Sequence, residues 1–542
     1  MKGMKGFLLC AGLLILALVL AAQTPQWQWA VGAGGTENDY VQFIAIDSQG
    51  NQYVAGAFSG IASFGDHTLT SSGYDDIFVA KLDSAGNWLW AVSAGGISWW
   101  DAGSGIDIDG VGNAYLTGEF WGTAIFGTHT LTSSGFNDIF AAKLDPNGNW
   151  LWAVSAGGLY IDYGLSIAVD SAGNALLTGN FRYTASFGDH TLPSNGSEGG
   201  DIFVAKLDHN GNWLWAVKAG GIGADAGTCI AVDSAGNAFL TGYFEGTASF
   251  GPHTLTSSGY EDIFAAKLDP AGNWLWAMSA GGASYDSGVG IAVDSAGNAL
   301  LTGAFQVTAS FGAHTLTSSG SYDIFAAKLD PTGNWLWAKR AGGALWNAGS
   351  GIAVDEDGNA YLTGAFEGNA SFGTHTINSS GDRDIFAAKL DPAGNWLWAV
   401  RAGGTGYEYG EGIAVDSGGN AFLTGNVFLG PACFGDHTII SSGGYDIFVA
   451  KLGSGTPVDE DLIPETSALS RLYDAYPNPL RPGQTAMIKT NVAERETGIF
   501  TVLNLRGQVI SRHALGPGSH QISFASGNLP SGVYLYQLQT PS

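Results

Sequence analysis

Trp88-Leu89-Trp90-Ala91-Val92 is one copy of a pattern that recurs along the chain and decides its fold. Each copy starts with a Trp-x-Trp pair, and successive pairs are separated by 61 to 63 residues. A fixed period of this size indicates stacked copies of one supersecondary unit rather than one ordinary core. The pairs begin at Trp27, Trp88, Trp150, Trp213, Trp274, Trp335 and Trp396.

One repeat, residues 351–401, contains four short segments with strand character. Asp357-Gly358-Asn359 separates the first two segments, and Pro392-Ala393-Gly394-Asn395 separates the last two. Glycine adopts positive φ without strain and asparagine tolerates it, so both stretches are typical of hairpin turns. The repeat therefore predicts a four-stranded antiparallel meander, with strands at Gly351–Asp355, Ala360–Gly364, Asp384–Asp391 and Trp396–Val400.

Both faces of these predicted sheets carry apolar residues, because side chains alternate between faces along segments such as 396–400. A sheet that is apolar on both faces must be covered twice, and radial packing of blades achieves this. The first Trp-x-Trp segment, 27–31, has no strands before it, and the last repeat has no such segment after Asp446–Leu452. The sequence thus predicts an all-β fold. It is a seven-bladed β-propeller of four-stranded blades over residues 23–452, in which the N-terminal strand completes the last blade.

The repeats also resemble a known family. The form Gly-Ile-Ala-Val-Asp-Ser-Ala-Gly-Asn-Ala-x-Leu-Thr-Gly, as at Gly290–Gly303, is similar to the bacterial seven-bladed β-propeller (SBBP) repeat. The similarity covers about residues 27–452. The resemblance implies a secreted propeller, and it implies no particular ligand.

The first 22 residues have the features of a secretory signal peptide. Lys2 and Lys5 precede an apolar run over residues 7–20, and Ala21 and Ala22 follow it. The run is shorter than the roughly 20 apolar residues that a membrane span requires. We therefore expect residues 1–22 to be removed and no membrane span to remain. The formal net charge of −27 opposes binding to nucleic acid or to anionic membrane surfaces.

The C-terminal part departs from the repeat. Residues 453–467 predict an acidic extended linker, and residues 468–542 predict a small antiparallel β-sandwich. Tyr476-Pro477-Asn478-Pro479, the turn at 504–508 and Leu529–Tyr534 resemble the C-terminal sorting domain of type IX secretion cargo. The resemblance implies the type IX machinery as a partner and the outer surface or surroundings of a diderm bacterium as the destination. The family continues into a further basic strand, so we expect this immunoglobulin-like domain to be shortened; a plain immunoglobulin-like spacer is the alternative.

Repeated polar residues in the propeller segment suggest scaffold roles. Seven histidines, from His67 to His437, occupy one repeat position in the connection between strands two and three, where we expect them at the periphery. Seven strand-three lysines, from Lys81 to Lys451, are expected to pair with strand acids or carbonyls. The Asp-x-x-Gly-Asn turns lack the oxygen spacing of a calcium loop. We find no catalytic motif and predict no catalytic residue, metal or cofactor, although two distant carboxylates for glycoside hydrolysis leave no sequence motif.

The repeats differ most in the loops that lead from strand four to the next strand one. These loops place aromatic residues beside acids, a combination that suits stacking on sugar rings with carboxylates holding hydroxyl groups. The alternative is that the aromatics cover the blades while the acids cap the loops by accepting backbone N–H bonds. The candidate binding residues are Trp99, Trp100, Asp101, Tyr160, Asp162, Tyr285, Asp286, Trp346, Tyr407 and Glu408.

These features favour a secreted or cell-surface, non-catalytic binding or adhesion protein whose ligand is a carbohydrate or a protein. Two other classes stay open. An extracellular carbohydrate-active enzyme could use the same ring, and a purely structural surface protein would bind nothing small. Fold alone does not choose among them.

Overall fold

The computed structural model describes residues 25–196, 199–428 and 430–453, and in the C-terminal part residues 471–476, 485–492, 497–504, 508–525 and 534–539. The predicted signal peptide, most of the predicted linker and several of the motifs that resemble a sorting domain lie outside the described residues. The chain forms two compact units, Met1–Thr456 and Pro457–Ser542. The described residues form strands and turns, and none of their segments is a helix long and apolar enough to cross a membrane.

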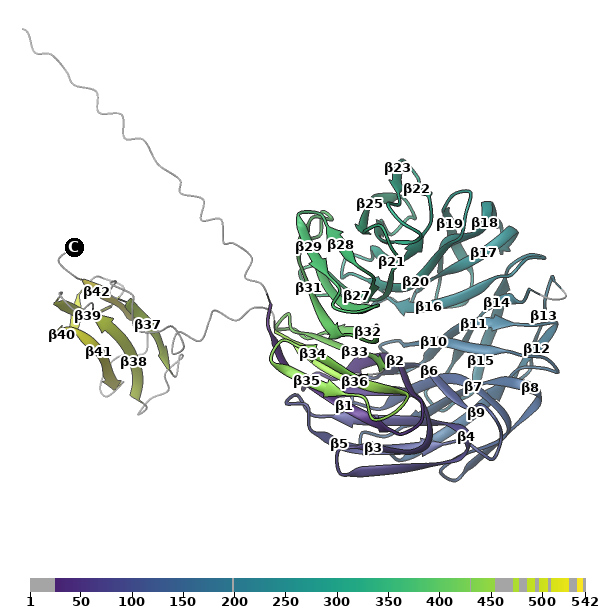
Figure 1. Cartoon of the computed structure of the whole chain (residues 1–542), viewed down its shortest axis with the longest axis horizontal. Helices are drawn as coiled ribbons and strands as arrows, with labels where there is room; N and C mark the ends of the chain where they lie inside the picture. Colours follow the sequence, from purple (N-terminus) through teal and green to yellow (C-terminus); the bar gives the residue numbers. More distant parts are fainter. Residues whose placement is uncertain are drawn as a thin grey trace, which may run out of the picture. The chain divides into compact units, whose positions relative to one another are not determined.

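Hydrogen-bonded sheets of four, six and eight strands make up most of the described part of the first unit, and four-stranded antiparallel groups within them are arranged around a centre in a propeller-like fold (Figure 1). These four-stranded groups are called sheets below. The first three sheets are β2 (Asp39–Ile46), β3 (Gln52–Phe64), β4 (His67–Leu82) and β5 (Trp88–Ala94); β6 (Ala102–Ile108), β7 (Ala114–Phe126), β8 (His129–Leu144) and β9 (Trp150–Ala156); and β10 (Tyr163–Val169), β11 (Ala175–Phe181), β14 (Asp201–Leu207) and β15 (Trp213–Ala219).

The remaining four sheets repeat this order. They are β16 (Ala226–Val232), β17 (Ala238–Phe250), β18 (His253–Leu268) and β19 (Trp274–Ala280); β20 (Asp286–Val293), β21 (Ala299–Phe305), β24 (Asp323–Leu329) and β25 (Trp335–Gly342); β26 (Asn347–Val354), β27 (Ala360–Phe366), β30 (Asp384–Leu390) and β31 (Trp396–Gly404); and β32 (Tyr407–Val415), β33 (Ala421–Phe428), β36 (Tyr445–Leu452) and β1 (Trp27–Gly35).

The ring is closed at both its inner and outer strands. The first strands contact one another in a cycle that runs β2, β6, β10, β16, β20, β26, β32 and back to β2. The N-terminal strand β1 pairs antiparallel with β36, with Ala30 opposite Ala450 and Val31 opposite Val449, where the sequence places it. Gly34 and Gly35 of β1 also pair with β3, so this strand joins the last sheet to the first.

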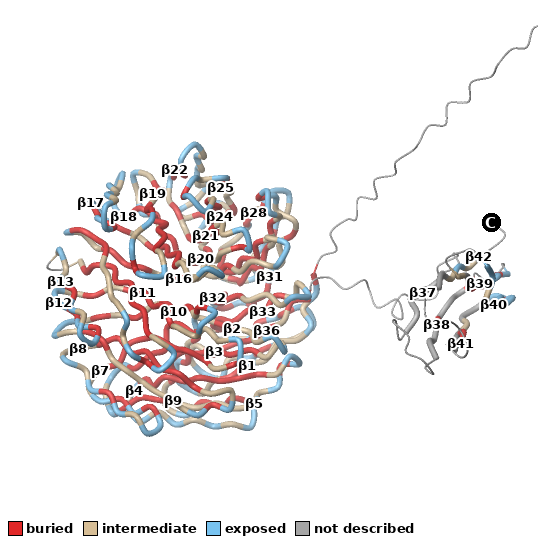
Figure 2. Tube along the Cα trace, turned by 180° about the vertical axis from the view of Figure 1, so that it is seen from behind, coloured by how far each residue is buried: buried red, intermediate tan, exposed pale blue. Residues whose placement is uncertain are grey.

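The core lies between neighbouring sheets and is buried on both faces of strand three. Ile77 and Val79 of β4 pack in one cluster with Leu116 and Phe140 of the next sheet, whereas Phe78 faces the opposite neighbour. Figure 2 shows the inner strands buried and the exposed residues concentrated on the loops and periphery. This double burial explains why strand three has no polar face.

The two tryptophans of each pair make different contacts. Trp88 packs edge-to-face on Phe64 of the same sheet, with ring centroids 5.3 Å apart. Trp90 donates its indole N–H to the carbonyl of Pro146, which lies in a turn of the next sheet, at 3.1 Å. Equivalent tryptophans repeat both contacts, so the Trp-x-Trp pattern joins each sheet to its successor.

The strand-three lysines lie against the turn aspartates. Six of the seven in the described part of the chain form ion pairs at 2.9 to 3.7 Å, as Lys206 does with Asp170. Each turn aspartate also accepts N–H bonds from its own turn, as Asp170 does from Asn174. The turns are therefore held by side-chain hydrogen bonds within the protein.

Outer hairpins extend the second and third strands beyond the sheets. In four repeats they form separate strands, where the sequence predicts only a longer connection. The hairpin pairs are β12 (Thr184–Phe187) with β13 (His190–Pro193), β22 (Thr308–Phe311) with β23 (His314–Thr317), β28 (Asn369–Phe372) with β29 (His375–Asn378), and β34 (Pro431–Phe434) with β35 (His437–Ile440). Each repeated histidine begins the second strand of such a hairpin, at the periphery of the ring.

The second unit contains two three-stranded antiparallel sheets among its described residues. One is β37 (Arg471–Tyr476), β38 (Thr485–Val492) and β41 (Gly518–Ala525), and the other is β40 (Val509–Leu515), β39 (Gly498–Asn504) and β42 (Tyr534–Gln539). Ile488 and Ile522 of the first sheet share a buried cluster with Phe500 and Val502 of the second. The unit therefore has its own small core.

Val307 has a backbone conformation that a β-branched residue rarely adopts. Its φ is +53°, and five of the six equivalent positions are glycines with positive φ. The side chain is 64% exposed, so it gains little from packing. We expect Val307→Gly to raise the free energy of unfolding by about 1 kcal/mol, because it removes this strain.

Thermal or denaturant unfolding measures this effect. Val111→Gly is the control, since Val111 is also exposed but has no positive φ. The control is expected to leave stability unchanged or to lower it. Equal effects of the two substitutions would contradict the strain at Val307.

Candidate functional site

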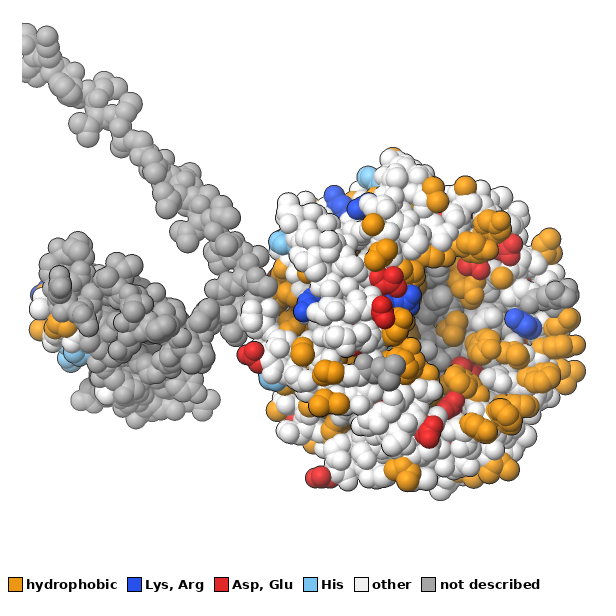
Figure 3. All heavy atoms as spheres, viewed as in Figure 1, with side chains coloured by type: hydrophobic (Ala, Val, Ile, Leu, Met, Phe, Trp, Pro, Cys, Tyr) orange, Lys and Arg blue, Asp and Glu red, His pale blue; other side chains and the backbone are white. Residues whose placement is uncertain are grey.

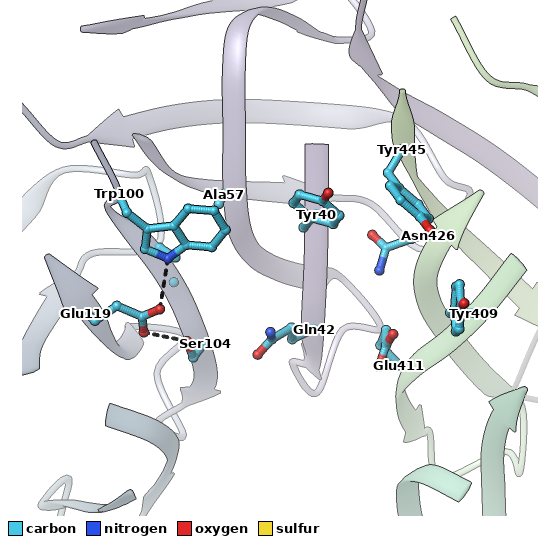
Figure 4. Close-up of a pocket in the computed structure, with 12 residues that line it drawn as sticks. Tyr40, Gln42, Ala57, Trp100, Ser104, Glu119, Tyr409, Glu411, Asn426 and Tyr445 are labelled. Carbon is cyan, nitrogen blue, oxygen red and sulfur yellow. Dashed lines mark hydrogen bonds between the residues drawn. The ribbon is translucent and has the colours of Figure 1, made fainter. Parts of the chain in front are cut away.

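The hub carries a cavity of about 460 Å³ between the sheets that begin with β32, β2 and β6. We call it the hub pocket. Figure 4 shows Trp100, Ser104 and Glu119 on one side, Tyr409, Glu411, Asn426 and Tyr445 on the other, and Tyr40 and Gln42 between them. Ala57, Ala102 and Gly103 complete the lining.

Glu119 forms one wall of the hub pocket. It lies on β7 and is only 7% exposed. The indole N–H of Trp100 donates to its Oε1 at 3.0 Å, and the Ser104 hydroxyl donates to its Oε2 at 3.1 Å. Burial raises the pKa of Glu119 to about 7, against the lowering effect of these two hydrogen bonds. This carboxyl group is held in one orientation by neutral donors.

Glu411 forms the opposite wall, on the first strand of the last sheet. Burial raises its pKa to about 7, while a hydrogen bond from Asn426 lowers it. Asn426 also joins two sheets, because its Oδ1 accepts the backbone N–H of Val41 at 3.0 Å. The glutamate is thus positioned by a residue that fixes the neighbouring strand β2.

Aromatic rings surround these two carboxyl groups. The ring of Tyr445 lies 5.4 Å from that of Tyr40 and 6.4 Å from that of Tyr409, measured between centroids. Arg383 donates to the Tyr409 hydroxyl at 2.7 Å, and its guanidinium group is paired with Glu367 at 2.7 Å. Trp100 contributes an indole from the opposite side, 42% exposed. The pocket therefore combines flat apolar surfaces with fixed polar groups, the usual composition of a small-molecule site.

The predicted aromatic residues lie at or just before the first strands of their sheets, and three of the six are in stacked pairs. Trp99 stacks on Tyr74, Tyr160 on Tyr183 and Tyr285 on Tyr260, with centroids 4.0 to 4.8 Å apart. Trp346 lies under the guanidinium group of Arg383 at 4.1 Å, and Tyr407 is 37% exposed. Figure 3 shows hydrophobic side chains gathered around the central hollow. Of the ten predicted residues, Trp100 alone lines the hub pocket.

The predicted acids are buried beneath these rings. Asp101 accepts the backbone N–H of Gly96 at 2.9 Å and that of Trp121 at 3.0 Å. Asp162 and Asp286 make the same two kinds of bond, and Glu408 accepts from Gly404. All four are at most 1% exposed. Their oxygens cap the loops, which is the arrangement expected if these acids have a structural role.

Several pocket residues are absent from the sequence-based candidates: Tyr40, Gln42, Ser104, Glu119, Tyr409, Glu411, Asn426 and Tyr445. Some of them could have been found in the sequence, because strands one and two have positions at which the residue type differs between repeats. The position of Glu119 is occupied in the other repeats by Ala57, Asn180, Tyr243, Ala304, Ala365 and Asn426. The position of Glu411 is occupied by Gln42, Ser104, Leu165, Thr228, Val289 and Ser350. The predicted binding residues were chosen from the variable loops alone. The strands that line the hub also vary between repeats, and these positions were not among the candidates.

Metal-ligating side chains do not converge within the described residues, where no group of three or more His, Cys, Asp or Glu could hold an ion.

Comparison with curated proteins finds distant relatives. An uncharacterized WD repeat-containing protein of Acanthamoeba polyphaga mimivirus is 25% identical and covers 78% of this chain. Regulatory protein FlaEY of Caulobacter vibrioides is 28% identical and covers 64% of this chain. This chain spans 38% of the length of each of these two relatives.

Solved structures give similar but weak matches. PorZ, described as an essential surface component of the type-IX secretion system of Porphyromonas gingivalis, has 14% identity and a TM-score of 0.29, over 92% of this chain and 69% of PorZ. A fungal alcohol oxidase in complex with copper has 12% identity and a TM-score of 0.41, over 96% of this chain and 97% of that enzyme. Both TM-scores are too low to transfer any chemistry to this chain.

The C-terminal unit has a direct family match. Residues 474–542 match the model of the secretion system C-terminal sorting domain. The match agrees with the resemblance seen at 476–479 and 529–534 in the sequence. This protein carries a type IX sorting tail and is exported to the extracellular space or outer surface of a bacterium.

Proposed function

We propose that this protein is a non-catalytic binding or adhesion protein that recognises a carbohydrate in the hub pocket. In this proposal residues 23–452 form a closed seven-bladed β-propeller of SBBP type after removal of the signal peptide at 1–22. Residues 453–467 link it to an immunoglobulin-like sandwich at 468–542, which the type IX machinery recognises.

The hub pocket is the observation that carries this proposal. Its volume of about 460 Å³ lies in the usual range of small-molecule sites. Tyr40, Trp100 and Tyr445 offer ring faces, and Gln42 with the two glutamates offers hydrogen-bonding groups. Aromatic faces suit the apolar faces of sugar rings, and carboxylates suit their hydroxyl groups. The rim residues Trp99, Tyr160, Tyr285, Trp346 and Tyr407 then extend the binding surface, above loops capped by Asp101, Asp162, Asp286 and Glu408.

One observation favours an enzyme as the second candidate. Glu119 and Glu411 both have a pKa of about 7, a value suited to general acid–base catalysis near neutral pH. A glycoside hydrolase would need both groups to reach one glycosidic bond. Turnover separates this candidate from a binding protein.

The test is a glycan array with the purified full chain, which scores bound ligands and released products together. We expect saturable binding without products, and Tyr445→Ala is expected to weaken it by about tenfold or more because a central ring is lost. Phe136→Ala is the matched control, since Phe136 is exposed and outside the pocket lining.

Equal binding by both variants would contradict the hub pocket as the site. Product release would contradict a non-catalytic role and support the glycoside hydrolase. Absence of any glycan binding would leave no support for a carbohydrate ligand.

A further inference from the structure

The two glutamates of the hub pocket are exceptions to the repeat that the fold does not require. Ala57, Ala304 and Ala365 occupy the position of Glu119 in other sheets, and Leu165 and Val289 occupy that of Glu411. These sheets form with the same strand register. Burying a carboxyl group costs free energy that an apolar residue avoids. Retention of two such groups in one pocket therefore points to a ligand rather than to stability.

Neither glutamate has a cationic partner among the residues that line the pocket, and the lining includes no lysine or arginine. Glu119 accepts hydrogen bonds from an indole and a hydroxyl group, and Glu411 accepts one from an amide. Arg383, which donates to the Tyr409 hydroxyl, is itself paired with Glu367. The pocket is thus a site of negative potential with neutral donors, inside a chain of net charge −27.

The same pocket presents aromatic faces beside the carboxyl groups. Tyr445 lies on the same side of the pocket as Glu411, Tyr40 lies between the two sides, and Trp100 donates directly to Glu119. Ring faces attract cations through their quadrupole, and two nearby carboxylates add charge–charge attraction. A neutral sugar would satisfy the rings but leave both carboxylates without a counter-charge. A ligand with an ammonium group satisfies both features.

We propose that the hub pocket binds a sugar with free, protonated amines, a short run of deacetylated hexosamine units, with one ammonium group at Glu119 and another at Glu411. This proposal rests on carbohydrate binding by the same pocket and specifies the charge of the ligand. Each ammonium group of such a ligand donates N–H bonds to one of the two carboxylates while the sugar rings lie against the aromatic side chains. An N-acetylated sugar has lost the charge and adds bulk at the same nitrogen.

Calorimetric titration of the full chain compares a chitosan tetramer with the fully acetylated chitin tetramer, at pH 6 and fixed ionic strength. We expect the chitosan tetramer to bind about tenfold or more tightly. Glu119→Gln and Glu411→Gln keep the shape of the pocket and are each expected to remove most of this preference. Glu356→Gln is the control, because it removes the same charge from an exposed turn.

Proton release gives a second readout. Both glutamates have a pKa of about 7 and are therefore mostly protonated at pH 6. Binding of ammonium groups requires them to ionise and is expected to release protons, seen as a dependence of the binding heat on buffer ionisation enthalpy. Glu119→Gln is expected to reduce this release, and Glu356→Gln is not.

The outcomes separate this inference from the proposed function. Equal affinity for both tetramers would overturn the amine preference and leave carbohydrate binding in place. Weakening by Glu356→Gln as strong as by the pocket variants would show non-specific attraction to an acidic surface and overturn the site. Failure of both tetramers and of every glycan on the array would overturn the proposed function as well.

Discussion

Deletion of residues 25–35, which include β1, is expected to lower the melting temperature of the first unit by about 10 °C or more. This strand completes the last sheet by pairing with β36 and contacts β3 of the first sheet. Trp27 packs edge-to-face on Phe434, and Trp29 donates to the carbonyl of Ser84. Loss of a fully buried Trp typically costs about 3–5 kcal/mol, and this deletion removes two partly buried ones and exposes the edge of β36. Differential scanning calorimetry measures the change.

A permuted chain is the control for this deletion. The backbone N–H of Gly453 donates to the carbonyl of Gln26 at 2.9 Å, so the end of β36 lies beside the start of β1. Residues 25–36 moved to follow Gly453 through a short turn can therefore pair with β36 as a hairpin. We expect this permuted chain to recover most of the lost stability. An unchanged melting temperature after the deletion, or no recovery in the permuted chain, would contradict ring closure by β1.

Stability of the first unit is expected to fall as pH rises from about 4 to about 7. Six sheet junctions each bury two carboxyl groups on either side of one glycine, as Asp162 and Asp138 do near Gly157. Burial raises the pKa of Asp39, Asp162, Asp225 and Glu408 to about 7 and that of Asp101 and Asp286 to about 6. Because these pKa values are raised, the folded chain holds protons that the unfolded chain releases between pH 4 and 7. The free energy of unfolding therefore decreases as the pH rises over this range.

The seventh junction indicates the role of the proton that the buried carboxyl pair holds in the other six junctions. There Asn347 replaces the acid and its amide donates to Asp323 Oδ1 at 3.4 Å. In the other six junctions the equivalent Oδ1 atoms, for example that of Asp262, are buried without a hydrogen-bond partner. A protonated carboxyl group can donate to this oxygen as the amide does, whereas two ionised groups repel each other.

Asp286→Asn tests this assignment, since Asp262 is the charged group that faces Asp286. The amide is expected to raise stability at pH 8 by on the order of 2 kcal/mol and to change it little at pH 4. Asp269→Asn is a control of opposite sign, because Asp269 has a lowered pKa in an exposed turn. It is expected to lower stability at pH 8. Thermal melts at both pH values measure the effects, and an equal shift at pH 4 and pH 8 for Asp286→Asn would refute a shared proton.

The sequence by itself determined the sheets, their order and the pairing of β1 with β36. These features follow from a local pattern repeated seven times, in which hairpin turns such as Asp357-Gly358-Asn359 and alternating apolar strands need no knowledge of distant residues. The match of residues 474–542 to a sorting domain likewise agrees with short local motifs. The outer hairpins were missed because each strand is only four residues long in four of the repeats.

Only the tertiary structure decided which residues share the candidate site. Glu119 and Glu411 lie in sheets far apart in sequence, and ring closure brings their strands to opposite sides of one pocket. The structure also separated the predicted loop residues by burial, since Trp99 is exposed while Asp101 is enclosed and caps its loop. A repeat pattern reports what every sheet shares. Binding depends on the few positions where sheets differ and on which of them meet at the hub, and that is set by packing across the ring.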